Sequence, residues 1–348
     1  PWKFDGKPCN SIYYRHFQFR GVYMRRRLCL VLACAGVLFL GGCAGLKQSL
    51  FEGGISMERW RSSLVEKQIR VDDLSVSYLE RAGSGDTIVL LHGFSGNKDL
   101  WVRFVRCLPR EYRVIAIDLP GHGSTTRDAT KTHSIQHLTL GFAQTVDALG
   151  LRSFHLAGNS MGGYVSILYS AAHPDRTLTL CLVDSAGLVA SPEPSDREVA
   201  LAHGINPLVP KTMDEFDSML GYAFHRQPFL PWPARSVTGA EYLERSSFNG
   251  KMWDDIMANR VNAAERLKDI RMPVLLMWGD RDRIIHISTL GVFQQGLPQA
   301  ETVVFKDCGH MPMLETPRES ASAYASFLEK NRGGGPAQTR GKTAAPQG

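Results

Sequence analysis

The stretch FHLAGNSMGG, residues 154–163, places Ser160 between Gly158 and Gly162 directly after an apolar run. Small residues two positions before and after a serine let the chain turn sharply from a strand into a helix, with the hydroxyl exposed at the turn. A serine hydroxyl is a weak nucleophile, and it needs a base, usually an imidazole that a carboxylate orients. The motif therefore predicts a nucleophilic serine if an acid and a histidine follow in the chain.

Two later segments contain such partners. Asp282 lies in MWGDRDR and His310 lies in DCGHMP, and each segment follows an apolar run typical of a buried strand. The chain order serine, acid, histidine predicts a catalytic triad of Ser160, Asp282 and His310. The spacing W-G-x-x-D favours Asp282 over Asp280, which we expect to be a turn residue. Asp184, at the end of LCLVD, is the alternative acid.

Attack of a serine on a carbonyl group also needs backbone N–H groups aimed at the oxyanion that forms. The N–H of Met161 directly follows the serine at the start of the predicted helix, and the N–H of Phe94 lies in the LLHGFSG loop after an earlier strand. We expect these two groups to form the oxyanion hole. His92, Asp118 and His122 lie in neighbouring strand-end loops and are interpreted as structural, because His310 already supplies the base.

The elements that must position these groups alternate regularly along the chain. Polar–apolar alternation in QIRVDDLSVSYLE predicts an antiparallel hairpin from about residue 68. Short apolar runs then alternate with helical patterns, which predicts an α/β fold with a mostly parallel sheet covered by helices on both faces. Residues 68–187 and 263–331 are expected to form this core.

The segment 188–262 interrupts the alternation and is too long for a simple connection. Its helical patches predict a helical cap inserted over the strand ends, where open sheets bind ligands. Most of its apolar side chains are expected to form the core of the cap. Those expected to contact substrate are Met213, Phe216, Met219, Phe229 and Trp232.

The N-terminal segment is typical of a bacterial lipoprotein. Residues 24–42 begin with Met24 and three arginines, continue as a short apolar run and end in LGG before Cys43. This pattern predicts a signal peptide, lipidation of Cys43 and a tether over 43–67, with an uncleaved anchor helix as the alternative. Residues 1–23 are expected to be an upstream extension that does not belong to the native chain. The Gly- and Pro-rich segment 332–348 is expected to be a disordered tail.

The composition argues against nucleic-acid and metal binding, and the net positive charge is confined to the N-terminal segment. The net charge of +6 arises from residues 1–42, which contain seven Lys or Arg and one Asp, so the remainder is balanced and nucleic-acid binding is not expected. Cys107, Cys181 and Cys308 remain after the proposed lipidation site, with neither metal-ligand spacing nor a disulfide framework. Neither metal nor cofactor is expected. Ala44, in place of an aspartate after the lipidated cysteine, favours the outer membrane of the cell envelope.

Over about residues 57–330 the chain resembles serine lipases and esterases of the α/β-hydrolase superfamily, particularly the family V bacterial lipases. It is also similar to membrane-bound monoacylglycerol lipases. The shared stretches are HGFSGNKDLW, DLPGHG, GNSMGG, CLVDSAGL, NPLVPKTMDEF, PFLP, WGDRD and CGHMPMLE. The resemblance implies hydrolysis of acylglycerols or related lipid esters through an acyl-enzyme, without a cofactor.

Two alternatives stay open at the level of the sequence. GNSMGG also occurs in hydrolases that cleave carbon–carbon bonds of aromatic ring-fission products with the same triad. A lipid-anchored binding protein on an inactive hydrolase fold is the second alternative, although no triad member is missing here. Acyl chain length, the choice between lipase and esterase, and oligomeric state do not follow from these motifs.

Overall fold

The computed structural model describes residues 44–332, so Cys43, the predicted signal peptide and most of the predicted tail lie outside the described residues. Its sheet has eight strands in the order β1-β2-β4-β3-β5-β6-β7-β8. The first two strands pair antiparallel, β2 pairs antiparallel with β4, and all later pairs are parallel. The strands are β1 Val65–Val71, β2 Leu74–Arg81, β3 Thr87–Leu91, β4 Arg113–Ile117, β5 Phe154–Asn159, β6 Thr177–Val183, β7 Val274–Gly279 and β8 Glu301–Phe305.

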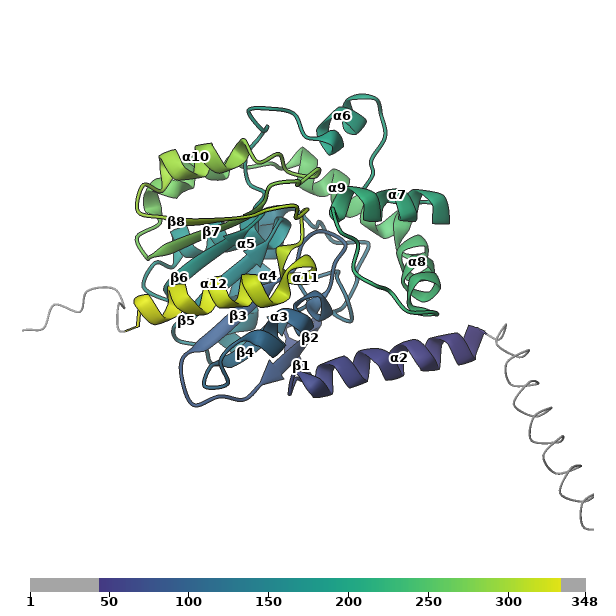
Figure 1. The fold of residues 1–348 in the computed structure, drawn as a ribbon, viewed down its shortest axis with the longest axis horizontal. Helices are drawn as coiled ribbons and strands as arrows, with labels where there is room; N and C mark the ends of the chain where they lie inside the picture. Colours follow the sequence, from purple (N-terminus) through teal and green to yellow (C-terminus); the bar gives the residue numbers. More distant parts are fainter. Residues whose placement is uncertain (1–43, 333–348) are drawn as a thin grey trace, which may run out of the picture. The chain divides into compact units, whose positions relative to one another are not determined.

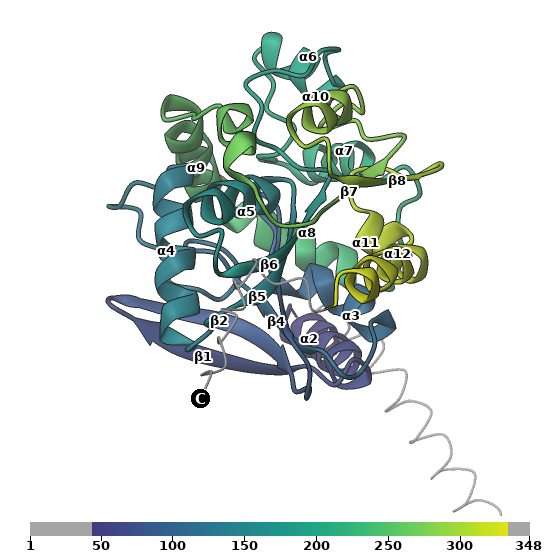
Figure 2. The same cartoon turned by 90° about the vertical axis from the view of Figure 1, so that its left-hand side faces the viewer.

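Helices cover both faces of this sheet, as the alternation predicts. In Figure 2, α4 and α5 lie on one side of the strands and α3 and α12 lie on the other. The helices of the core are η2 Lys98–Trp101, α3 Val102–Cys107, α4 Ile135–Ala148, α5 Met161–Ala172, η3 Ala263–Asp269, α10 Thr289–Gly296, α11 Pro312–Glu315 and α12 Pro317–Lys330.

The central strands are mostly apolar because both of their faces are buried. In β3, Val89 and Leu91 belong to the hydrophobic cluster under α4 and α5, whereas Ile88 and Leu90 belong to the cluster under α3 and α12. Successive side chains of a strand point to opposite faces, so a strand between two helical layers favours apolar residues on both faces.

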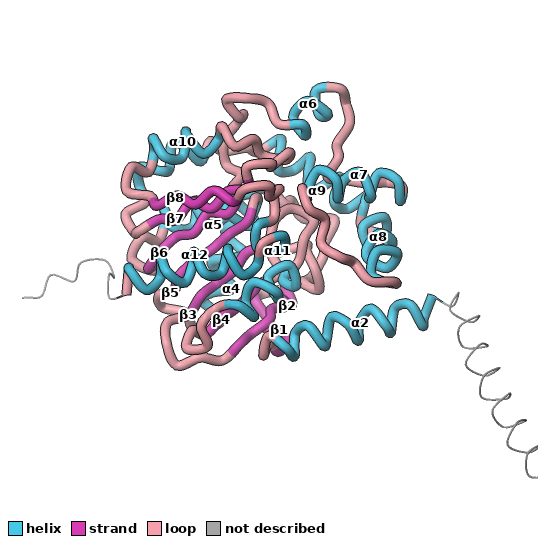
Figure 3. Tube along the Cα trace, in the orientation of Figure 1, coloured by secondary structure: helices cyan, strands magenta, loops and turns pink. Residues whose placement is uncertain are grey.

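The segment expected to form a cap is mostly helical (Figure 1) and lies near the strand ends that bear the site (Figure 3). Ring contact between Phe94, which follows β3, and Trp253 of the last cap helix places that helix beside the carboxyl end of β3. The cap helices are α6 Asp196–Ala202, α7 Met213–Ala223, α8 Ala234–Glu244 and α9 Ser246–Ala258.

The segment expected to be a tether is largely helical, since α2 spans Ala44–Arg61 and β1 then begins at Val65. The end of this helix is bound to the core, because Arg59 donates two hydrogen bonds to the Asp99 carboxylate at 2.6 and 2.7 Å. No helix among residues 44–332 is both long and apolar enough to cross a membrane.

Candidate active site

Ser160 occupies the sharp turn between β5 and α5 that its flanking glycines predict. Its backbone angles are φ 54° and ψ −118°, a left-handed conformation that residues with a side chain seldom adopt. A hydrogen bond to the neighbouring strand β6 helps to hold this strained turn, since the Ser160 N–H donates to the Val183 carbonyl at 3.0 Å. The result is a serine fixed at the end of a buried strand and at the start of a helix.

The two glycines are required because backbone segments approach closely there. A Cβ atom on Gly158 would lie 2.3 Å from the Gly162 carbonyl oxygen, and one on Gly162 would lie 2.5 Å from the Leu91 carbonyl oxygen. These contacts are backbone atoms that a side-chain rotation cannot relieve. Any larger residue at either position would therefore displace the turn that carries Ser160.

An acid–base pair lies in the loops after β7 and β8. His310 Nδ1 is 2.7 Å from Asp282 Oδ2, and both side chains are buried. The other carboxylate oxygen of Asp282 accepts hydrogen bonds from the N–H groups of Ile284 and Ile285 at 2.8 and 3.0 Å. These bonds hold the carboxylate toward Nδ1 of the imidazole, the arrangement that an orienting acid and a histidine base require.

The backbone of His310 is also fixed from two directions. Its N–H donates to the Ala223 carbonyl at the end of α7 at 3.0 Å, and its carbonyl accepts from the Asn159 side chain at 3.1 Å. Asn159 immediately precedes Ser160, so one side chain connects the serine turn to the histidine loop. This role of Asn159 was not predicted from the sequence, although its position inside GNSMGG was an available signal.

Asp184 lies beside the pair rather than replacing Asp282. One of its carboxylate oxygens accepts from the Gly279 N–H at 2.9 Å. Burial, and next the charge of Asp282, raise the pKa of Asp184 well above its ordinary value, which favours the protonated acid. One oxygen or nitrogen atom each of Asp184, Asp282 and His310 lies within 4.8 Å of the others, close enough to bind one metal ion. Two of these groups, the carboxylate of Asp282 and the imidazole of His310, are already hydrogen-bonded to each other.

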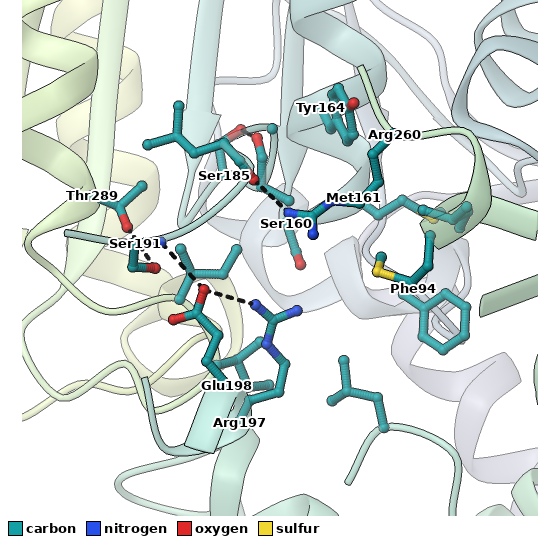
Figure 4. Close-up of a pocket in the computed structure, with 18 of the residues that line it drawn as sticks. Phe94, Ser160, Met161, Tyr164, Ser185, Ser191, Arg197, Glu198, Arg260 and Thr289 are labelled. Carbon is teal, nitrogen blue, oxygen red and sulfur yellow. Dashed lines mark hydrogen bonds and ion pairs between the residues drawn. The ribbon is translucent and has the colours of Figure 1, made fainter. Parts of the chain in front are cut away.

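Phe94 and Met161, the predicted oxyanion donors, both line the pocket that contains Ser160 (Figure 4). Met161 is the first residue of α5, so its N–H has no acceptor within the helix. The loop that carries Phe94 approaches the serine closely, because a Cβ on Gly93 would lie 3.1 Å from the Ser160 Cβ. Both backbones are therefore near the position where an oxyanion would form.

The histidines of the neighbouring loops have structural contacts. His92 Nε2 accepts a hydrogen bond from the Leu119 N–H at 3.1 Å, and Asp118 accepts from both the N–H and the ammonium of Lys98. Burial lowers the pKa of His92 to about 4 and that of His122 to about 3. His92 connects two loops through this bond, and neutral imidazoles at both positions fit the structural interpretation.

The pocket beside Ser160 is lined by side chains from the core loops, α6 and α9. Its apolar part combines residues after β3 with residues of α9 and of the loop that follows Asp282. The lining comprises Phe94, Ser160, Met161, Tyr164, Ser185, Ala186, Gly187, Leu188, Ser191, Arg197, Glu198, Leu208, Trp253, Ile256, Met257, Arg260, Ile284, Ile285 and Thr289.

None of the five cap residues expected to contact substrate is among these lining residues. Phe216 and Met219 are buried in a separate cluster within the cap, where they pack with Leu220. Met213, Phe229 and Trp232 are exposed, with 36%, 82% and 64% of their surface accessible. The cap instead reaches this pocket through α6, α9 and its connecting segments, because packing rather than apolar character decides which elements face the cleft.

Known proteins resemble this chain over most of its length. The model of the Alpha/beta hydrolase family matches residues 88–323. Lipase 1 of Psychrobacter immobilis is 32% identical over 87% of this chain and 96% of its own length. A monoacylglycerol lipase of Mus musculus is 30% identical over 72% of this chain and 78% of its own length.

Solved structures agree with these relatives. The crystal structure of a membrane phospholipase A, described as a bacterial virulence factor, is 35% identical and superimposes with a TM-score of 0.81 over 90% of this chain and 99% of its own. A 2-hydroxy-6-oxo-6-phenylhexa-2,4-dienoate hydrolase from Rhodococcus, at 22% identity and a TM-score of 0.65 over 76% of this chain and 99% of its own, shares the fold. The chain therefore belongs to the alpha/beta hydrolase family and is a carboxylic ester hydrolase of the lipase and esterase type.

Proposed function

We propose that this enzyme hydrolyses acyl esters of glycerolipids, with Ser160 as nucleophile, His310 as base and Asp282 as the acid that orients the histidine. The observation that carries the proposal is the 2.7 Å contact between His310 and Asp282 behind a strained serine turn. The names of its lipase relatives support an acyl ester as the bond cleaved.

In this mechanism Nε2 of His310 takes the proton of the Ser160 hydroxyl while Oγ attacks the ester carbonyl. The carbonyl oxygen becomes an oxyanion, which the N–H groups of Phe94 and Met161 stabilise. His310 then donates its proton to the leaving alcohol, and an acyl-serine remains. Water, deprotonated by the same imidazole, attacks this ester and releases the fatty acid and the serine hydroxyl. Asp282 stabilises the imidazolium in both halves of the cycle.

The apolar part of the pocket supports a fatty acyl chain as the acid component. Leu208, Ile256 and Met257 line it together with Ile284 and Ile285. Each buried methylene contributes about 0.8 kcal/mol, so four further carbons add about 3 kcal/mol if the pocket covers them. A carbon–carbon hydrolase, the alternative, would act on a conjugated diketo acid and has no reason to favour longer acyl chains.

The wild-type enzyme should show kcat/KM values for p-nitrophenyl esters that rise from acetate to a medium chain. Met257→Gln, which keeps the length of the side chain but adds a polar amide to the pocket, should flatten this rise. Met213→Gln is the matched control, because Met213 is not among the residues that line the pocket. A wild-type profile that falls beyond acetate would refute the lipid substrate, and flattening by Met213→Gln alone would place the acyl site on α7.

We further propose that the enzyme is anchored in the bacterial cell envelope through a lipidated Cys43, with the outer membrane favoured because Ala44 follows the cysteine. The support is the sequence of residues 24–43, with its arginines, apolar run and terminal LGGC. Labelled palmitate should enter the wild type and Cys34→Ser but not Cys43→Ser. Detection of residues 25–42 in the intact mass of the membrane-bound protein would contradict cleavage.

A further inference from the structure

The pocket beside Ser160 contains charged groups that a neutral glyceride does not need. Arg197 and Glu198 of α6 line it, and so does Arg260, which follows α9. In the view of Figure 4, the guanidinium groups of Arg197 and Arg260 come from separate segments, and Ser160 is drawn between them. An apolar pocket that includes two arginines suggests a substrate with both a hydrocarbon chain and an anionic group.

Arg197 is held in a position where its charge is poorly compensated. Its side chain is 18% exposed, and its guanidinium lies 5.9 Å from the centre of the Trp253 ring. Its backbone N–H donates to the Arg283 carbonyl at 3.0 Å, which ties α6 to the residue after Asp282. Among the described residues, its buried Nε has no hydrogen-bond partner. Burial is the main influence on the Arg197 guanidinium and lowers its pKa.

Glu198 is near Arg197 but is already engaged by other donors. Its carboxylate accepts from the N–H groups of Ser195 and Ser191 at 2.8 and 3.2 Å and from the Ser195 hydroxyl at 3.1 Å. Burial raises the Glu198 pKa, but these bonds and Arg197 outweigh it and lower the pKa, so the carboxylate is ionised. It reaches the Arg197 guanidinium only at 3.7 Å, longer than a direct charge-assisted hydrogen bond.

Arg260 contacts neutral acceptors rather than a carboxylate. Its guanidinium donates to the carbonyl of Leu188 at 3.1 Å and to the carbonyl of Val189. No ion pair of Arg260 occurs among residues 44–332. The residue is exposed, so it borders the pocket on the side open to solvent. Two guanidiniums and one carboxylate leave the charged part of the pocket with a net positive charge.

We propose that Arg197 and Arg260 form an anion subsite that binds the phosphate of a glycerophospholipid, so that phospholipids are preferred over neutral glycerides as acyl-ester substrates. This inference rests on the ester hydrolysis proposed above. Guanidinium groups match phosphate oxygens with paired N–H donors, and desolvation strengthens the attraction. The structurally similar protein named as a membrane phospholipase A supports the same substrate class.

The test compares lysophosphatidylglycerol with a monoacylglycerol of the same acyl chain in mixed micelles of a neutral detergent. Wild type should prefer the phospholipid in kcat/KM, and Arg197→Gln and Arg260→Gln should each lower its value roughly 10–100-fold, the range for a charge-assisted hydrogen bond. Monoacylglycerol hydrolysis should change little. Arg235→Gln is the matched control, since Arg235 pairs with Asp217 on the surface of the cap and does not line the pocket.

Further measurements distinguish failure of the subsite proposal from failure of the proposed function. Glycerol 3-phosphate should inhibit wild type competitively and should inhibit Arg197→Gln much more weakly. If inorganic phosphate inhibits wild type as strongly as glycerol 3-phosphate does, the subsite binds free phosphate and the lipid proposal is overturned. Equal losses on both substrates, with unchanged thermal unfolding, would show that Arg197 only supports Asp282 and would refute the subsite. If wild type hydrolyses monoacylglycerol but shows no phospholipid preference, the subsite fails alone. If it hydrolyses neither ester, the proposed function fails.

Discussion

Ser160→Ala and His310→Ala should each lower kcat for a p-nitrophenyl ester by about 10⁴–10⁶, because nucleophile and base act as one unit. Ser160→Ala removes the oxygen that forms the acyl-enzyme in the proposed mechanism, and His310→Ala removes the proposed acceptor of its proton. Both substitutions remove few packing atoms, so thermal unfolding should change little. Steady-state kinetics and circular dichroism measure the two effects separately.

A control and a double variant make this result specific. Ser170→Ala changes a buried serine on the same helix, α5, that does not line the pocket, so its activity should stay near that of wild type. The Ser160→Ala/His310→Ala variant should be little worse than either single variant. Losses that multiply would mean that the two residues act independently and would contradict a shared mechanism.

Asp282→Asn should lower kcat by about 10⁴, the loss expected when an amide replaces the carboxylate and the wrong imidazole tautomer is favoured. Its geometry would be retained, because the amide oxygen of the new residue can still accept from the N–H groups of Ile284 and Ile285. The measured loss would therefore come from the charge and acceptor that face His310 Nδ1.

Asp184→Asn is the matched comparison, and it should keep most of the activity. Asparagine can accept from the Gly279 N–H as Asp184 does. Its NH₂ group can also donate to Asp282, as a protonated Asp184 would, since the raised pKa of Asp184 favours that form. Loss of activity in Asp184→Asn alone, with Asp282→Asn active, would assign the acid to the end of β6 and overturn the proposed triad.

Much of the site could be predicted from the sequence, because its chemistry depends on local features. A serine between Gly158 and Gly162 after an apolar strand defines its own turn, since the backbone contacts that exclude larger residues lie within the motif and at the adjacent strand end. Asp282 follows β7, which is apolar and buried throughout, and His310 follows the partly exposed strand β8. The carboxyl ends of parallel strands meet at one edge of a sheet. The mostly parallel sheet with helices on both faces is confirmed for the same reason.

The residues that line the pocket could not be predicted from the sequence. Helices α7 and α9 both carry apolar residues along one side. Only α9 lines the pocket, with Trp253 and Ile256, whereas Phe216 and Met219 of α7 do not. Helical periodicity indicates that a face is apolar, but not which partner covers it.

The sequence by itself indicated the mostly parallel sheet, the serine turn and the candidate triad, with Asp184 open as the alternative acid, since strand periodicity, turn chemistry and chain order are local properties. Tertiary structure alone decided that Asp184 lies against Asp282, that Asn159 holds His310, and that Arg197 and Arg260 line one pocket with Ser160. These groups are separated by tens of residues or more. The first two contacts depend on which strands lie side by side in the sheet, and the third depends on how the cap packs over the strand ends. No local pattern encodes either.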